Sequence, residues 1–172
     1  MKPIIDITMD DATGVGPEII SKALSLKDDL TNTKDYGMML IVSSLKVTHV
    51  TTHMSLREAC NKIKKEAYIQ GDKIDRESLK RNGDKNPRIA AAGLNPHCGE
   101  GGLFGKEEIE EIEPAVEIAK KEGINVIGQL PADTVFVRTK DGAYDAVVAM
   151  YHDQGHIPIK MLGLEWDEKR QE

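Results

Sequence analysis

The sequence of 172 residues has little of several features that mark specialised classes of protein. Its two cysteines, Cys60 and Cys98, belong to no pairing motif, so a disulfide framework is not expected. Aromatic residues make up only 4% of the chain, which predicts an aliphatic core. Basic residues are outnumbered, and the net charge of -6 argues against a nucleic-acid backbone as partner. A small anionic substrate remains compatible with this total, because the charge near a site matters more.

Long apolar runs are also missing. No stretch approaches the roughly 20 apolar residues that a membrane span needs, so no membrane association is expected. The first residues carry neither an apolar region nor a cleavage site typical of a secretory signal peptide. Internal repeats and low-complexity tracts are not visible. The expected location is therefore the reducing cytoplasm.

The chain does contain a regular alternation of strand and helix patterns. Its length fits one domain, or one and a fraction. Such alternation predicts an α/β fold, with a mostly parallel sheet and helices on both faces. The expected strands are residues 3–8, 38–42, 46–51, 88–92, 124–127 and 144–149, and the expected helices are residues 18–26, 56–65, 72–81, 106–122 and a short one from 131 to 136.

Two of these helices carry specific local signals. Ser55 followed by Glu58 forms a capping box, which predicts a helix beginning near residue 56. Pro114 inside the long helix predicts a kink. The apolar positions of that helix recur at steps of three and four residues, and they are Ile109, Ile112, Val116 and Ala119.

The first loop, residues 9–17, contains Gly14 and Gly16 and ends at Pro17. A glycine-containing loop between strand and helix can hold phosphate. It can equally be a tight turn without a ligand. The turn interpretation is favoured here, because the full dinucleotide-binding fingerprint is missing.

Three histidines, His53, His97 and His152, each follow a predicted strand. Parallel strands end at one edge of a sheet, where open α/β folds place their chemistry. Three imidazoles delivered from rigid elements can bind a metal ion and leave positions open for substrate. The alternative is three unrelated surface or bridging histidines, since their long spacing forms no local motif. We predict that the three rings share one divalent ion.

The other two histidines lie four residues from members of this set. His49 precedes His53, and His156 follows His152. On a helix that spacing would suggest a zinc pair. Both pairs are expected to span a strand and a loop, so His49 is interpreted as packed and His156 as at most a neighbour of the ligands.

Further polar residues could serve the same site. Asp153 and Asp133 could orient an imidazole or move a proton, although Asp133 could equally be a helix cap after Pro131. Lys160 could bind an anionic substrate, and by base rate it is a solvated lysine. Cys98 could be a soft ligand or a redox-sensitive thiol, but such a cysteine is more often a small filler.

Five motifs together resemble one enzyme family. They are ITMDDATGVGPE at 7–18, VTTH at 50–53, GLNPHCGEGG at 93–102, LPADTVF at 130–136 and AMYHDQGH at 149–156. They are similar to the 4-hydroxythreonine-4-phosphate dehydrogenase family of pyridoxine biosynthesis, with its phosphothreonate and phosphoerythronate dehydrogenase relatives. The resemblance covers nearly all of the chain and implies a fold like isocitrate and isopropylmalate dehydrogenases, usually as a homodimer.

The resemblance also implies roles for particular residues. His53, His97 and His152 match the metal-binding histidines, and Lys160 matches a substrate-binding lysine. The implied reaction oxidises a secondary alcohol of a small phosphorylated acid with NAD or NADP, and the pyridoxine enzyme then releases carbon dioxide. A divalent metal (zinc, magnesium or cobalt) would polarise the alcohol oxygen. Asp153 and Asp133 are our candidate catalytic carboxylates.

The family is considerably longer than this chain. We therefore interpret residues 1–28 as a remnant of the first, cofactor-binding domain. Residues 29–164 would form the metal- and substrate-binding α/β domain, and residues 165–172 a charged tail. Two alternatives stay open: a truncated, catalytically inactive remnant that still binds metal, and half of a dimeric scaffold completed by a partner chain.

Overall fold

The computed structural model describes residues 39–65, 67, 69, 79 and 85–163. The predicted strand 3–8, the loop 9–17 and the helices 18–26 and 72–81 lie wholly or almost wholly outside these residues, as do the segments 1–28 and 165–172. No helix among the residues described has both the length and the apolar character that crossing a bilayer would require.

The described residues form one five-stranded sheet in the order β1-β2-β5-β3-β4. Strand β1 pairs with β2 in antiparallel fashion, and the other neighbouring pairs are parallel. The mostly parallel α/β sheet predicted from the sequence is therefore confirmed. The strands are β1 (Met39–Val42), β2 (Leu45–His49), β3 (Ile89–Ala92), β4 (Val126–Leu130) and β5 (Ala146–Ala149).

The central strands β3 and β5 are buried at every position. Both are short runs of small and branched apolar residues, the pattern expected when helices cover both faces of a parallel sheet. Alternate residues serve separate cores. Ala91 and Val148 belong to a core that also contains Val116 of a helix, whereas Ala90 and Val147 belong to a second core that contains Phe136.

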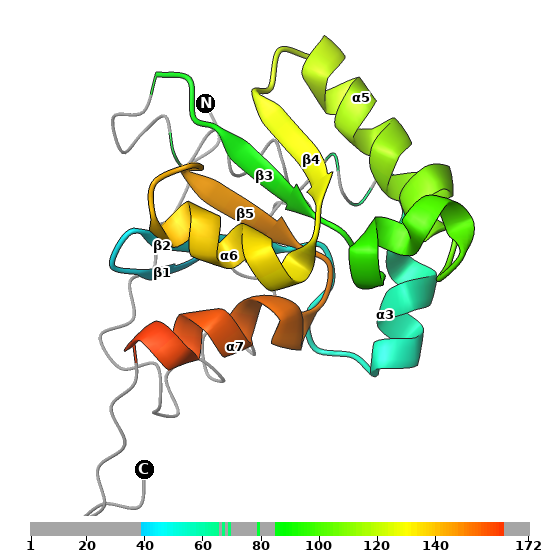
Figure 1. Cartoon of the computed structure of the whole chain (residues 1–172), viewed down its shortest axis with the longest axis horizontal. Coiled ribbons are helices and arrows are strands. Elements are labelled where there is room, and N and C mark those ends of the chain that lie inside the picture. The colour runs from blue at the N-terminus through cyan, green and yellow to red at the C-terminus, as the bar shows by residue number, and fades with distance from the viewer. Residues whose placement is uncertain (1–38, 66, 68, 70–78, 80–84, 164–172) are drawn as a thin grey trace, which may run out of the picture.

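Two sets of helices cover these faces (Figure 1). Helix α5 packs in the first core, and α6 and α7 pack in the second. Ser55 caps α3, and its side chain accepts a hydrogen bond from the Glu58 amide at 3.3 Å, which confirms the helix start predicted near residue 56 and one of the two bonds of a capping box. The helices are α3 (Leu56–Lys62), α5 (Glu113–Lys121), α6 (Ala132–Lys140) and α7 (His152–Gly163).

The predicted long helix at 106–122 differs from the structure in its first turns. Residues Glu108–Ile112 form the π-helical segment η2, and α5 continues from Glu113. A π-turn inserts one residue and so rotates the faces of what precedes it. As a result Glu108 is fully buried, whereas Ile109, predicted to face the core, is 47% exposed.

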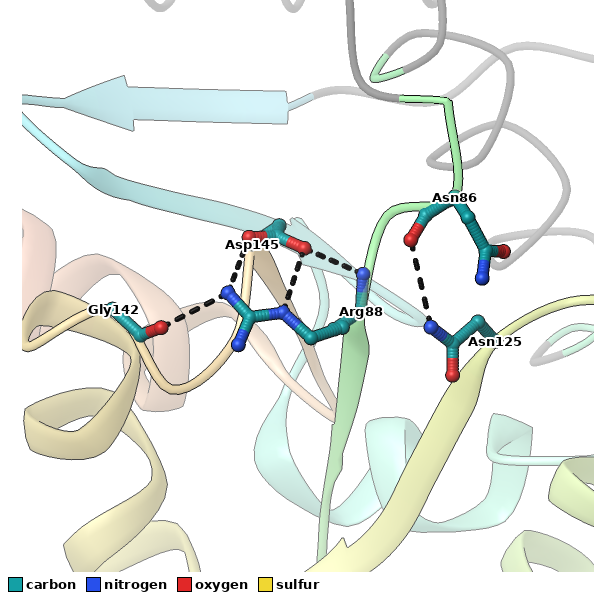
Figure 2. A network of polar contacts seen from close by, with 5 residues as sticks. All are labelled: Asn86, Arg88, Asn125, Gly142 and Asp145. Carbon is teal, nitrogen blue, oxygen red and sulfur yellow. Dashed lines mark hydrogen bonds and ion pairs between the residues drawn. The ribbon is translucent and has the colours of Figure 1, made fainter.

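An ion pair between Arg88 and Asp145 lies at the end of the sheet where strands β3 and β5 begin (Figure 2). The guanidinium of Arg88 donates to Asp145 Oδ1 at 2.8 Å and to the carbonyl of Gly142 at 2.9 Å. Asp145 also accepts from the Arg88 amide at 2.6 Å. These contacts hold together the residues that precede β3 and β5.

Candidate metal and substrate site

The three strands that precede the predicted ligands are neighbours in the sheet. Strand β5 lies between β2 and β3, and all three run parallel. His53 follows β2, His152 follows β5 and His97 follows β3, so the three histidines leave the same edge of the sheet. The strand-end argument made from the sequence therefore matches the observed topology.

His53 and His152 lie close together in space. Their ring centroids are 5.4 Å apart, with an angle of 57° between the planes. Two imidazoles that share a tetrahedral ion at about 2.1 Å per nitrogen have ring centroids about 5 Å apart. The pair thus has a separation that suits two ligands of one metal ion.

Asp153 orients the ring of His152. The Nδ1 atom of His152 lies 2.7 Å from Asp153 Oδ1, and this hydrogen bond is the main cause that lowers the pKa of the Asp153 carboxyl. With Nδ1 engaged by a carboxylate, Nε2 is the nitrogen left to bind an ion. Carboxylate–histidine pairs of this kind fix the tautomer of metal-ligating imidazoles.

The expectation that His152 and His156 span a strand and a loop is wrong. Helix α7 begins directly at His152, so the two residues are one turn apart on the same helix. Their rings stack at 3.7 Å with an interplanar angle of 12°, and His156 Nδ1 lies 3.0 Å from the His152 carbonyl oxygen. The stacked ring of His156 supports His152 from one side.

His49, the last residue of β2, is packed as predicted. Its ring lies 4.8 Å from that of His156 and 6.5 Å from that of His152. Both of its ring nitrogens are buried and lack a hydrogen-bond partner in the described part of the chain. Burial, followed by the neighbouring His156 and His152, lowers the pKa of His49 to about 3. The ring is therefore neutral near neutral pH.

His97 stands apart from this cluster. It lies in the segment η1 (Pro96–Gly102), and its side chain is 73% exposed. Its Nδ1 atom is 3.6 Å from Glu100 Oε2, and its ring centroid is 6.3 Å from that of Phe104. Residues 97–101 all have left-handed backbone angles, which bulky L-residues adopt at a cost. The structure thus brings together two of the three predicted ligands.

Two buried residues near these corners were missed by the sequence analysis. Glu108 accepts hydrogen bonds from the amides of Leu94 and Asn95 at 2.8 and 2.6 Å. Gln154 bonds to Met150 and to Gly93. Gln154 sits inside a recognisable motif, which was a usable signal. Glu108 gave none, because it occupies a helix position where a glutamate is normally exposed.

The remaining predicted residues lie around the same edge. Asp133 is exposed in the first turn of α6, and Pro131 holds the N-cap position, so Asp133 is not the cap. Its charge contributes, after burial and Glu108, to a raised pKa of the Cys98 thiol, which places it near the loop of His97. Lys160 is exposed on α7, where its charge acts on Asp153 and His156.

An open pocket adjoins the His53–His152 pair. It has a volume of about 270 Å³, and both histidines line it together with Asp153 and Thr52. Tyr151 and Leu56 give it apolar walls. A concave space with a few convergent polar groups is the usual form of a small-molecule site. A small substrate placed here would touch the rings of both histidines.

The residues present fit a divalent ion in part. Among the described residues, no group of three histidine, cysteine or acidic side chains has the geometry of a complete metal site. The pair His53–His152 could supply two nitrogen ligands, and Asp153 is hydrogen-bonded to the ring of His152. The ligand role of His97 stays a prediction.

The described residues form an α/β protein with a cluster of imidazoles and an open pocket at the carboxyl edge of its sheet. Residues 21–167 match the family described as Pyridoxal phosphate biosynthetic protein PdxA. The chain belongs to this family, which confirms the resemblance; four of the five motifs lie within the matched residues, and the motif at 7–18 precedes them.

The relatives and solved structures agree with this assignment. A protein of Oceanobacillus iheyensis is 56% identical over 138 residues, 80% of this chain and 42% of its own length. The D-threonate 4-phosphate dehydrogenase of Pectobacterium atrosepticum is 51% identical over 134 residues, 78% of this chain and 41% of its own. The crystal structure of 4-hydroxythreonine-4-phosphate dehydrogenase from Klebsiella pneumoniae is 48% identical, with a TM-score of 0.78, over 81% of this chain and 43% of that one. The chain therefore spans about two fifths of the length of these proteins.

Proposed function

We propose that this chain forms the metal- and substrate-binding part of an NAD- or NADP-dependent dehydrogenase that oxidises a small phosphorylated hydroxy acid. The substrate class would be 4-phosphohydroxythreonine or a phosphothreonate-like acid, with loss of carbon dioxide where the product is a β-keto acid. The observation that carries the proposal is the pair His53 and His152, whose ring centroids lie 5.4 Å apart and which both line an open pocket. The sequence similarity of the chain to dehydrogenases named for such substrates supports the same proposal.

His53 and His152 would hold a divalent ion, zinc, magnesium or cobalt, and His97 would complete the set from the neighbouring corner. A bound ion of this kind supplies Lewis-acid polarisation of the substrate's hydroxyl oxygen. Asp153 keeps Nδ1 of His152 engaged and so leaves Nε2 as the nitrogen for the ion. The residues of the chain thereby orient the ligand atoms before substrate arrives.

Asp133 and Lys160 would act on the substrate itself. Asp133, exposed beside the His97 loop, is our candidate for moving a proton. Lys160, exposed two turns along α7 from the His152 corner, offers a point charge to a phosphate or carboxylate. We assign no residue to the nicotinamide cofactor. A homodimer is the proposed assembly.

Metal titration tests the ligand set directly. The chelator-treated full chain is titrated with zinc by calorimetry, alongside the variants His53→Ala, His97→Ala and His152→Ala. Each loss of a true ligand should weaken binding at least about tenfold. His156→Phe is the matched control, because phenylalanine keeps the stacked ring and removes both nitrogens. Unchanged affinity in His97→Ala would exclude that residue from the set.

A second experiment decides between the enzyme and the inactive alternative. That alternative is a chain that binds the ion without turnover. NAD and NADP reduction is followed with 4-phosphohydroxythreonine and with phosphothreonate, each with added zinc or magnesium. Metal binding without any turnover would overturn the dehydrogenase proposal and leave the metal-binding one.

A further inference from the structure

Two imidazoles of the histidine cluster pack face to face. His152 is the first residue of α7 and His156 lies one turn later, so the two side chains are neighbours on one side of the helix. Their ring centroids are 3.7 Å apart, with 12° between the planes. The other rings are farther away and tilted, since His53 lies 5.4 Å from His152 and His49 lies 4.8 Å from His156. The ring of His156 therefore covers one face of the His152 ring.

The ring of His156 is itself held in place. Its Nδ1 atom donates a hydrogen bond to the His152 carbonyl oxygen at 3.0 Å, because a carbonyl oxygen can only accept. The ring of His49 lies beside it on the half-buried side of α7. Gly155 leaves the space for His49, since a Cβ at that position would collide with the His49 ring. His156 is thus a fixed surface against which another ring can rest.

Asp153 alone does not fix the plane of the His152 ring. Its Oδ1 atom lies 2.7 Å from His152 Nδ1, so it holds one point on the edge of the ring. Asp153 is exposed, and a rotation of the ring about this edge contact would keep the hydrogen bond. The His152 side chain is 34% exposed at the wall of the pocket, where other staggered rotamers have room. A flat neighbour on one face takes that room away.

We infer that His156 is a positioning residue for His152: its flat ring, packed on one face of the His152 ring, holds that imidazole at the wall of the pocket and close to His53. The inference deepens the proposed function and rests on it, because the site proposed there depends on the orientation of His152. It assigns His156 no contact with an ion or a substrate. It involves only neighbouring rings and does not depend on the position of His97.

Three substitutions in the full chain separate the flat ring from the hydrogen bond. His156→Phe keeps a ring and removes the donor. His156→Gln keeps a donor for the His152 carbonyl and removes the ring. His156→Leu removes both and keeps an apolar side chain of similar size. Ile157→Ala is the matched control, because Ile157 is the next residue of α7 and is 57% exposed.

NMR of the histidine side chains measures the orientation of His152 directly. The spectra are recorded in chelator at about pH 8, where imidazoles are neutral. Long-range proton–nitrogen spectra show which ring nitrogen of His152 carries the proton, and in the wild type this should be Nδ1, bonded to Asp153. The nuclear Overhauser effect between the ring protons of His53 and His152 reports how close the two rings are.

The variants should divide according to whether they keep a ring. His156→Phe and Ile157→Ala should give the wild-type tautomer of His152 and the wild-type Overhauser effect to His53. His156→Gln and His156→Leu should give a mixture of tautomers and an Overhauser effect weakened by at least about twofold, since contacts between aromatic rings shift an equilibrium by about two- to tenfold. If His156→Leu does not fold, His156→Gln carries the same comparison.

Two results would overturn the inference. The first is a wild-type spectrum of His152 in the variants without a ring. The second is a disturbed His152 in His156→Phe together with an undisturbed one in His156→Gln, which would assign the effect to the hydrogen bond. Because these spectra are recorded without metal, they judge His156 whether or not the chain binds an ion. The zinc titration described above judges the proposed function separately, and a wild-type chain that binds no zinc would refute that proposal alone.

Discussion

The buried imidazole of His49 makes the stability of this protein depend on pH in a predictable direction. Both of its ring nitrogens are buried without a partner among the described residues, and the rings of His156 and His152 lie beside it. Its pKa falls from 6.5 to about 3, mainly through burial and then through the charges of these two neighbours. The folded chain therefore disfavours the protonated ring, whereas the unfolded chain does not.

The size and sign of the effect follow from these two values. Between pH 6.5 and about pH 3 the unfolded chain binds more protons at this position, so the free energy of unfolding falls as the solution is acidified. The full difference is about 5 kcal/mol, at about 1.4 kcal/mol per pKa unit. Between about pH 7.5 and about pH 5 it amounts to about 2 kcal/mol.

Urea unfolding of the wild type and of His49→Leu, both in chelator, measures this contribution. Leucine is apolar and similar in volume, and it leaves no hydrogen bond broken because His49 makes none among the described residues. Acidification from about pH 7.5 to about pH 5 should cost the wild type about 2 kcal/mol more than the variant. His97→Leu, which removes an exposed ring, is the control and should behave as the wild type does.

Parallel pH dependence in wild type and His49→Leu would refute the reasoning. It would mean that the ring finds a partner, or water, when protonated. A large loss of stability in His49→Leu near pH 7.5 would contradict a different step, because it would show that the ring nitrogens make contacts that matter in the neutral form.

Three further predictions concern packing and charge, and each is checked by urea unfolding. Gly128→Ala should cost about 1–3 kcal/mol, because a Cβ there would meet the Ala91 side chain and its carbonyl, the latter at 2.7 Å. Gly155→Ala should also cost about 1–3 kcal/mol, because the methyl group would meet Val47 Cγ1 at 2.8 Å and the ring of His49. A change from glycine to alanine normally stabilises a helix, so a higher free energy of unfolding in this variant would contradict the observed packing. Asp145→Ala should cost about 1–3 kcal/mol, because it leaves the Arg88 amide without its acceptor. Since hydrogen bonds from Arg88 lower the pKa of Asp145, this loss should be present above the ordinary pKa of an aspartate and should disappear in acid.

The sequence predicted the sheet because its strands are unambiguous. Buried runs such as those of β3 and β5, separated by helical patterns, admit few arrangements other than a parallel sheet. Helix α7 was not predicted as a helix, because Gly155 and Pro158 lower its intrinsic propensity. Its packing against the sheet through Ile159 overrides that preference, as tertiary contacts often do.

The candidate site was predictable only as far as strand ends determine it. His53 and His152 come together because β2 and β5 are parallel neighbours. The ring of His97 could not be placed, since no pattern in the sequence predicts the left-handed backbone of residues 97–101. The burial of Glu108 could not be predicted, because it depends on a π-helical turn that rotates the helix face. The spacing of apolar residues in the sequence does not indicate such a turn.

The hydrogen bonds that join the strand ends near the candidate site all involve residues from Thr51 to Gln154 in the sequence. Hydrogen bonds made by Thr51, Gln154 and Gly93 join the ends of four strands, and Glu108 accepts from the amides of Leu94 and Asn95 before the segment of His97. Because parallel strands buried on both faces resist sliding, these links can hold the ligands at fixed separations. If His53 and His152 hold an ion as proposed, its binding would depend on one edge of one sheet, whereas turnover would also require residues that position the cofactor and substrate.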